Sequence, residues 1–422
     1  MDKEEAKRSE LKPSLGLWDA TAISVGAIIG AGIFVVTGIV AGLAGPALVI
    51  SMLVAAIIAL FTALSFAELT AWLPKEGSVY EYAHQLISPF SGFLAGWMWM
   101  LSNTFTGAAV SLGFAYYLTA LVPILPANWI AATACIALTT LNYVGIRQSA
   151  LLNNVLVTAK LLILAFFVVL GTAYVNTANF VPFAPSEAGV LFGAYYIFFA
   201  YAGFARVAVV AEEVKDAKRI VPKAILLSLV ISTIFYGIVG TVAVGLVGST
   251  KLSESSSPLA EAISATGSLS AVQVVTAGGL LATASVLLTS ILGVSRMAYS
   301  MARRNDLPQI LRKLHQKYNT PHYSIWIVGL LMTLLVLLVD LTRIVVVSTF
   351  ASLFYYALAN VSALRLKVEK RLYPMFVPVL GVATCTVLLI SVFFVSLQAL
   401  IIGVACLLAG AVYYVAKQKI ST

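Results

Sequence analysis

Apolar runs of about twenty residues recur along almost the whole chain, and they limit its fold more than any other feature. A helix needs about 20 consecutive apolar residues to cross a bilayer. Of the 422 residues, 61% are hydrophobic and only 10% are charged, against about 25% charged in an ordinary soluble domain. The sequence therefore predicts an all-α polytopic membrane protein with twelve transmembrane helices, over residues 16–43, 46–72, 89–121, 128–145, 151–175, 188–213, 223–248, 269–301, 322–338, 341–366, 373–396 and 398–416.

Lysine and arginine fall almost wholly on one side of this predicted topology. Cytoplasmic loops retain these residues, so the asymmetry orients the chain. With the N-terminus inside, the outer loops hold only Lys251 and Arg343. We therefore expect a multi-pass protein of the plasma membrane, with both termini in the cytosol and a cytosolic tail over residues 1–15 that lacks the features of a signal peptide. The cytosolic loops carry the remaining basic residues, at Lys3 to Lys12, Lys75, Arg147, Lys215 to Lys223, Arg303 to Lys317, Arg365 to Arg371, Lys417 and Lys419.

The same loops account for the net charge of +9 without nucleic acid, because the basic residues are scattered rather than gathered on one face. The cysteines lie inside predicted spans, and the histidines lie in loops or at span ends. No pair of cysteines has metal-ligand spacing, and the sequence indicates no metal, cofactor or catalytic constellation. We predict that the protein is not an enzyme. The residues considered are Cys135, Cys385, Cys406, His84, His315 and His322.

Three glycines crowd the first predicted span, in the stretch GAIIGAGIF at 26–34. Glycine costs about 1 kcal/mol relative to alanine in a helix interior, so this helix is locally weak. Small residues at four-residue spacing, such as Gly26 with Gly30 and Ala27 with Ala31, also suit close helix packing. The alternative is a helix that is broken within the membrane.

The sixth span carries a matching interruption at Gly203, in FAYAGF, and it follows the first by five spans. Five is odd, so the two segments cross the membrane in opposite directions, as in a transporter with an inverted repeat. We predict one repeat over 16–175 and the second over 188–366, with helices 1 and 6 broken at the bilayer midplane. Two further helices and a cytosolic C-terminus follow at 367–422.

Broken helices expose backbone groups that need a partner in the membrane. The amides of Gly30 to Ile33 suit a carboxylate, because they begin a half-helix. Carbonyls near Ile28 and Ile29, with those of Phe199 and Ala202, suit an ammonium group. The breaks together suit a zwitterion such as an amino acid.

Four stretches carry a family resemblance: GAIIGAGIF, AELTAWLPKEGSVYEYA, FAYAGFARVAVVAEEVKDAKRIVPKAI and SRMAYSMARRNDLPQILRKLHQKYNTP. They resemble motifs of the amino acid-polyamine-organocation (APC) transporter superfamily. The resemblance implies the leucine-transporter fold, in which spans 1, 2, 6 and 7 form a bundle against a scaffold of spans 3, 4, 5, 8, 9 and 10. It also implies that the substrate binds between the two breaks and that Phe199 and Tyr201 gate this site. The alternative is that these two rings only pack against their neighbours. The expected substrate-binding residues are Ile28, Ile29, Gly30, Ala31, Gly32, Ile33, Phe199, Tyr201, Ala202 and Gly203.

Lys160 lies about ten residues into the fifth span, too deep for easy snorkelling to the cytosol. Desolvation disfavours its charged form, so we expect it to gain and lose a proton. The resemblance implies the same role, since several proton-coupled or sodium-independent members carry a lysine here in place of a sodium ion. A fixed ammonium that only joins spans, or one facing water, is the alternative. The expected neighbours are the backbone at Gly26 and Ala27 and the side chains of Thr283 or Ser285.

Further charged residues lie inside the predicted spans or near their cytosolic ends. Arg206 follows Gly203, where much of the APC superfamily carries a carboxylate, and Ala205 beside it is neutral. This departure argues against cationic substrates. We expect Arg206 to join a structural or gating ion pair, for which Glu68 is one candidate, and Arg296 to belong to the same cytosolic gate. The alternatives are contact of Arg206 with an acidic side chain of the substrate, and solvated charges at the interface.

The sequence thus predicts a secondary active transporter that takes up a neutral L-amino acid with a proton by alternating access. The alternatives are a sodium-independent exchanger, a transporter of cationic amino acids or polyamines, and an amino acid sensor that does not transport. The expected partners are an amino acid, a proton and the lipid bilayer. The side chain of the substrate and the oligomeric state stay open.

Overall fold

A computed structural model describes residues 13–75, 77–122, 125–144, 150–183, 186–318 and 320–421, and over these residues the chain is helical without a sheet. The all-α prediction is confirmed. Most of the expected N-terminal tail, residues 1–12, lies outside the described residues, as does Arg147. The helices are α2 (Leu17–Ile28), α3 (Thr37–Ala44), α4 (Leu48–Trp72), α5 (Val79–Leu86), α6 (Pro89–Leu121), α7 (Ala127–Val144), α8 (Ala150–Thr172), α9 (Glu187–Tyr201), α10 (Ala217–Glu254), α11 (Pro258–Ser264), α12 (Leu269–Arg303), α13 (His322–Leu338), α14 (Leu341–Arg365), α15 (Phe376–Val395) and α16 (Leu397–Ser421).

Nine helical segments of the described chain are long and apolar enough to cross a membrane. The first of them, Leu17–Trp72, contains two of the predicted spans, because α3 passes into α4 through a single 3₁₀ turn at Gly45–Ala47. The predicted spans 128–145 and 322–338 correspond to the shorter helices α7 and α13. Helix therefore occupies each of the twelve predicted ranges, and nine segments meet the length and apolarity of a span.

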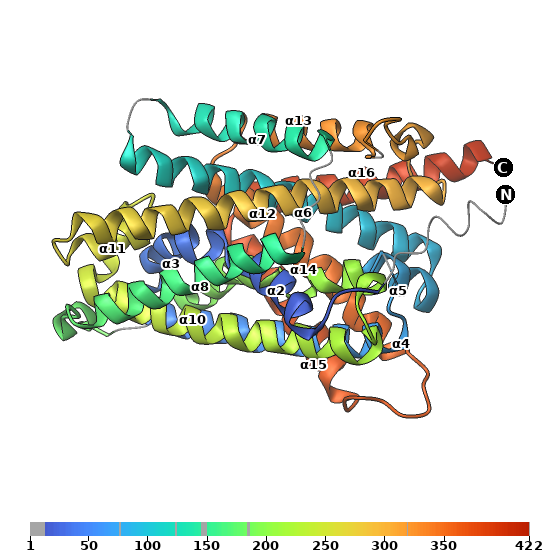
Figure 1. Cartoon of the computed structure of the whole chain (residues 1–422). Coiled ribbons are helices and arrows are strands. Elements are labelled where there is room, and N and C mark those ends of the chain that lie inside the picture. The colour runs from blue at the N-terminus through green and yellow to red at the C-terminus, as the bar shows by residue number, and fades with distance from the viewer. Residues whose placement is uncertain are drawn as a thin grey trace.

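The long helices lie side by side, and the short helices α5 and α11 lie at opposite ends of the molecule (Figure 1). The C-terminal end of α16 lies at the α5 end. The charge pattern puts the loop that holds Lys75, before α5, in the cytosol and the loop that holds Lys251, before α11, outside, which agrees with this separation. One end of α10 differs from expectation: the helix continues to Glu254 beyond an interruption at Gly248, whose φ of +78° favours glycine.

Two helical segments are interrupted at the predicted positions. After α2, Ile29 adopts an extended conformation (φ −78°, ψ 93°), and the chain resumes as a π-helical turn η1 (Gly32–Val36) before α3. After α9, a turn at Ala202 and Gly203 leads into a 3₁₀ helix, η4 (Phe204–Glu213). The apolar runs thus cross the molecule as pairs of half-helices.

The two interruptions pack directly against each other. A methyl group on Gly32 would overlap Ala200, and one on Gly203 would overlap the backbone of Ala27. The hydroxyl of Ser24 donates to the Phe204 carbonyl (2.9 Å), which adds a polar contact between the same segments. Close packing and helix breaking, the two readings of these glycines, therefore occur together: the glycines let two broken helices touch.

Candidate functional site

At the first break, the backbone of span one is buried, and one of its amide groups has no hydrogen-bond acceptor among the described residues. Ile28, Ile29 and Ala31 are buried. The amide of Gly30, which lies in the bend, donates to no acceptor among the described residues. This free donor precedes a half-helix, whose positive dipole end favours an anion.

Lys160 of α8 reaches the same bend from the side. Its side chain is fully buried, and Nζ donates to the carbonyls of Gly26 (3.3 Å) and Ile29 (3.4 Å). These carbonyls end α2, where the helix dipole is negative and favours a cation. No carboxylate pairs with Lys160 among the described residues. The backbone of the break alone therefore stabilises this ammonium.

The other expected neighbours of Lys160 make different contacts. Thr283 donates to the Gly279 carbonyl of its own helix (2.7 Å), and the carbonyl of Ser285 accepts from Thr289 (3.1 Å). No hydrogen bond joins either side chain to Lys160 in the described part of the chain. The backbone of Ala27 instead lies against Gly203.

Tyrosine hydroxyls satisfy several of the freed carbonyls, and none of these residues was expected at the site. Tyr236 of α10 donates to Ile28 O (2.8 Å) and lies 3.4 Å from Ala200 O, so one hydroxyl touches both breaks. Tyr356 of α14 donates to Ala202 O (2.5 Å), and Tyr117 of α6 donates to Phe34 O (2.6 Å). A tyrosine inside an apolar run was the only signal available in the sequence.

The carbonyls assigned to an ammonium group thus already accept hydrogen bonds within the protein. Ile28 O accepts from Tyr236, Ile29 O from Lys160 and Ala202 O from Tyr356. A carbonyl oxygen has two lone pairs, so each retains capacity for a second donor. The breaks can still hold an ammonium, but by sharing these oxygens.

The two aromatic residues expected at the gate are both buried next to the breaks. Phe199 is 6% exposed and Tyr201 is fully buried. The Tyr201 ring lies against Tyr236, with centroids 5.1 Å apart, and its hydroxyl has no hydrogen-bond partner among the described residues. A buried hydroxyl without a partner costs free energy, which makes Tyr201 Oη a candidate contact for a ligand.

Arg206 does not form the ion pair with Glu68 that we considered. Its guanidinium donates to Asn103 Oδ1 (2.7 Å) and Thr289 O (3.2 Å) and lies 5.9 Å from the Trp99 ring. The suggested pair fails because the side chain runs towards α6 and α12, where amide and carbonyl oxygens take its donors. Arg206 therefore ties the half-helix η4 to two other spans, and no carboxylate among the described residues takes part.

Glu68 instead lies 3.6 Å from Arg371, a residue between α14 and α15. Arg371 also donates to the carbonyls of Ala363 (2.9 Å) and Leu366 (2.7 Å) at the end of α14. Its guanidinium thus neutralises a buried carboxylate and caps a helix. Arg296 is exposed on α12 and makes no ion pair with any described residue.

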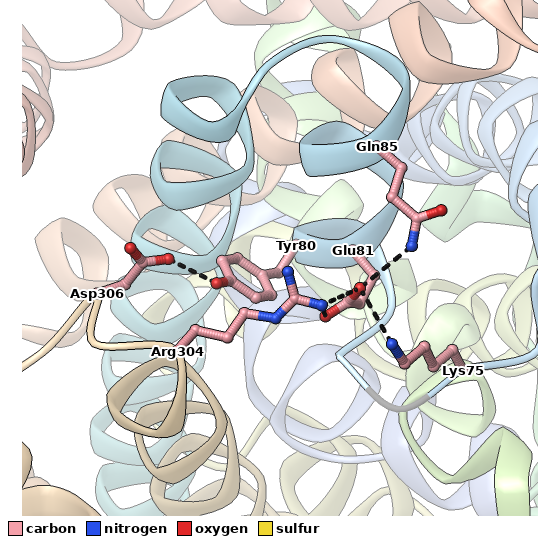
Figure 2. Close-up of polar contacts among 6 residues, drawn as sticks. All are labelled: Lys75, Tyr80, Glu81, Gln85, Arg304 and Asp306. Carbon is pink, nitrogen blue, oxygen red and sulfur yellow. Dashed lines mark hydrogen bonds and ion pairs between the residues drawn. The ribbon is translucent and has the colours of Figure 1, made fainter.

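A second polar cluster, which the sequence analysis missed, surrounds the buried carboxylate of Glu81 on α5 (Figure 2). Arg304 lies 2.6 Å from Oε1, Lys75 lies 3.7 Å from Oε2, and Gln85 donates to Oε2 at 3.3 Å. The cluster joins α5 to the end of α12 at the α5 end of the molecule. The only signal in the sequence was a glutamate in the loop between the second and third predicted spans.

Tyr80 extends this cluster towards the segment after α12. Its hydroxyl donates to Asp306 Oδ2 (2.5 Å), and the Arg304 guanidinium lies over its ring at 5.6 Å. Burial, followed by the hydrogen bond to Asp306, raises the pKa of Tyr80 well above its usual value. The phenol therefore stays a proton donor to Asp306.

No group of three histidine, cysteine or acidic side chains among the described residues is placed to hold a metal ion. The buried polar groups at the breaks are backbone amides and carbonyls, tyrosine hydroxyls and one ammonium. Such groups bind and orient a small polar molecule.

The sequence matches the amino acid permease family over residues 15–416. It is 34% identical to an uncharacterized transporter of Mycobacterium tuberculosis, covering 98% of this chain and 93% of that protein. It is 31% identical to the branched-chain amino acid permease BcaP of Bacillus subtilis, over 96% of this chain and 92% of the permease. Cationic amino acid transporter 4 of Mus musculus is also 31% identical, over 87% of this chain and 62% of that protein.

These matches confirm the resemblance to the APC superfamily and the prediction that the protein is not an enzyme. They also make the chain a multi-pass membrane protein with an amino acid as the substrate that the family implies. The chain belongs to the amino acid permease family of the APC superfamily.

Proposed function

We propose that this permease takes up neutral L-amino acids together with a proton, by alternating access in the plasma membrane with both termini in the cytosol. Twelve spans form two inverted repeats, 16–175 and 188–366, followed by two C-terminal helices. The substrate carboxylate binds amides at Gly30 to Ile33. Its ammonium binds carbonyls at Ile28, Ile29, Phe199 and Ala202, with Phe199 and Tyr201 as the gate and Gly203 at the second break.

One observation carries this proposal: Lys160 donates to Gly26 O and Ile29 O at the break of span one. The charged ammonium stabilises the carbonyl end of α2, and loss of its proton removes that charge and weakens both hydrogen bonds. Protonation of one side chain is thereby linked to the conformation of the break beside the substrate.

A second contact supports the inverted repeat. Lys160 belongs to the fifth predicted span and binds carbonyls at the break of the first, whereas Tyr356 belongs to the tenth and binds Ala202 O at the break of the sixth. The fifth and tenth spans occupy the same place in the two repeats. The corresponding helix of each repeat therefore donates a hydrogen bond to the break of its own repeat. In the first repeat the donor is a lysine ammonium, and in the second it is a tyrosine hydroxyl.

A neutral substrate fits the residues around the second break. The segment Ala202 to Ala205 carries no acidic side chain, and a cationic substrate would lack a carboxylate partner there. The relative named for branched-chain amino acids covers nearly the whole chain, which supports an apolar side chain. A relative is also named a cationic amino acid transporter, so arginine belongs in every substrate test.

The test of coupling is uptake of leucine by proteoliposomes containing Lys160→Met, with and without an inward proton gradient. We expect the wild type to accumulate leucine only with the gradient, and the variant to lose that accumulation. Lys251→Met, which changes an exposed lysine at the far end of α10, is the matched control and retains it. Full gradient-driven accumulation by Lys160→Met would refute proton coupling through this residue.

A binding measurement separates lost coupling from lost folding. Leucine that binds only the folded protein stabilises it, by about 2.7 kcal/mol when the leucine concentration is 100 times the dissociation constant. The unfolding temperature rises as a result. We expect this shift for leucine and not for arginine. Uptake that requires amino acid inside the vesicle would instead identify an exchanger, and binding without any flux would identify a sensor.

A further inference from the structure

An open pocket lies in the segment that connects α12 to α13 and at the start of α13, outside the breaks and outside the cluster around Glu81. Its volume is about 510 Å³, and its lining includes Lys313, His315, Lys317, His322 and Tyr323. The segment that forms it lies at the α5 end of the molecule (Figure 1). None of the mechanism proposed above uses these residues.

The lining is basic and has no acidic member. Lys313 and Lys317 are exposed, and neither joins an ion pair among the described residues. Two lysines in one pocket without a carboxylate make it attractive to an anion.

The histidines add directed hydrogen-bond groups. His315 Nδ1 accepts from the amides of Lys317 and Tyr318, both at 3.3 Å, so its Nε2 carries the proton and can donate. His322 Nδ1 is buried and has no hydrogen-bond partner among the described residues. The rings of the two histidines touch, with centroids 5.6 Å apart. The turn thus presents donors beside the two lysines.

Aromatic residues place the pocket at the level of a membrane surface. Tyr143 of α7 contacts Tyr318 (5.7 Å between centroids) and Trp326 of α13 (6.1 Å). Tyrosine and tryptophan gather where the apolar core of a bilayer meets its headgroups. This aromatic cluster is therefore compatible with headgroup depth for the basic side chains beside it.

An exposed apolar stripe on α13 begins at this pocket. Tyr323, Ile327, Leu330, Leu334 and Leu338 are 39%, 47%, 54%, 52% and 72% exposed. Their spacing of three or four residues puts them on one face of the helix. In a membrane protein such a face contacts acyl chains. A molecule bound in the pocket therefore lies next to an apolar helix face on which its own hydrocarbon chains can pack.

We propose that this pocket binds the headgroup of an anionic phospholipid whose acyl chains lie along the exposed face of α13. The phosphate meets Lys313, Lys317 and His315, and the apolar stripe holds the chains. Basic pockets beside membrane helices favour anionic headgroups in this way. A free phosphorylated solute would share the phosphate chemistry but would gain nothing from the stripe.

The test titrates the purified full chain in detergent with phosphatidylglycerol or phosphatidylcholine and counts bound lipids by native mass spectrometry. We expect preference for phosphatidylglycerol, and a loss of about tenfold or more in its affinity in the double variant Lys313→Gln, Lys317→Gln. The control Lys218→Gln, Lys223→Gln removes the same charge from exposed positions on α10 and keeps the affinity. Lys313→Arg, Lys317→Arg restores charge and is expected to bind as the wild type.

Equal affinity in the Gln variant and the wild type would overturn the proposal, as would an equal loss in the control. Inorganic phosphate at millimolar concentration is the second arm, and we expect it not to displace the lipid. Displacement by phosphate alone would show a site for a soluble anion and would also overturn the lipid assignment.

Discussion

At the scale of single residues, hydroxyl groups hold the broken helices in place. In the membrane no water satisfies a freed carbonyl, so each needs a donor from the protein. Tyr236, Tyr356 and Tyr117 supply one each, from three different helices. Single atoms on neighbouring spans therefore decide whether the breaks are stable.

Removal of the Tyr236 hydroxyl tests this role. Tyr236→Phe leaves Ile28 O without its donor, at a cost of about 1–3 kcal/mol for a buried polar group. We expect a lower unfolding temperature, measured by thermal scanning in detergent. Tyr201→Phe is the control, because that hydroxyl has no partner to lose, and it should unfold no earlier than the wild type. A larger loss in Tyr201→Phe than in Tyr236→Phe would contradict the assignment.

The same Tyr201→Phe variant also tests whether the Tyr201 hydroxyl contacts the substrate. Its ring stays in Tyr201→Phe, so packing against Tyr236 is kept while the hydroxyl is lost. We expect a higher KM for leucine with little change in thermal stability. An unchanged KM would remove Tyr201 Oη from the substrate site.

At the scale of helical elements, the close approach of α2 and η4 depends on glycine. A methyl group at position 203 would lie 2.6 Å from both Ala27 O and Ile28 N, which are backbone atoms that no rotamer change can move away. Gly203→Ala must therefore separate the two broken helices. Such overpacking costs about 1–3 kcal/mol.

We expect Gly203→Ala to lose leucine uptake in proteoliposomes and to unfold at a lower temperature. Gly237→Ala on α10 is the matched control: no atom lies within 4 Å of its added methyl, and alanine favours the helix by about 0.5–1 kcal/mol. It should keep uptake and unfold slightly later. Full uptake by Gly203→Ala would show that the breaks need not touch.

The short helix α5 depends on an ionic contact rather than on glycine. Glu81→Gln removes the charge that Arg304 and Lys75 share, which weakens the link between α5 and α12 by about 1–3 kcal/mol, since both cations are partly exposed. The measurement is the rate of maleimide labelling at Ala83→Cys, a buried position on α5, in a protein that also carries Cys406→Ser. We expect faster labelling with Glu81→Gln and no change with Glu261→Gln, an exposed carboxylate on α11. Equal rates in all three proteins would mean that the cluster does not hold α5.

At the scale of the whole molecule, the sequence could predict features that depend on neighbouring residues, but not features that depend on packing between distant segments. The two helix interruptions were predictable, because the three glycines of GAIIGAGIF and the single glycine within FAYAGF are local features of the sequence. The contacts of Arg206 were not, since Asn103 and Thr289 lie 103 and 83 positions away along the chain. The tyrosines were missed for the same reason: inside an apolar run, a hydroxyl that caps a distant helix looks like any buried ring.

Orientation is the remaining property of the whole molecule that the charge pattern predicts, and α10 offers its test. Lys218 and Lys251 lie near opposite ends of this helix, and both are exposed. The lysine distribution puts the first in the cytosol and the second outside. In intact cells, a membrane-impermeant maleimide should therefore label Lys251→Cys at once and Lys218→Cys only after permeabilisation. Cys406 is the native cysteine that is not fully buried, so both variants carry Cys406→Ser. The reverse pattern would invert the topology and move the Glu81 cluster and the proposed lipid pocket to the outer surface.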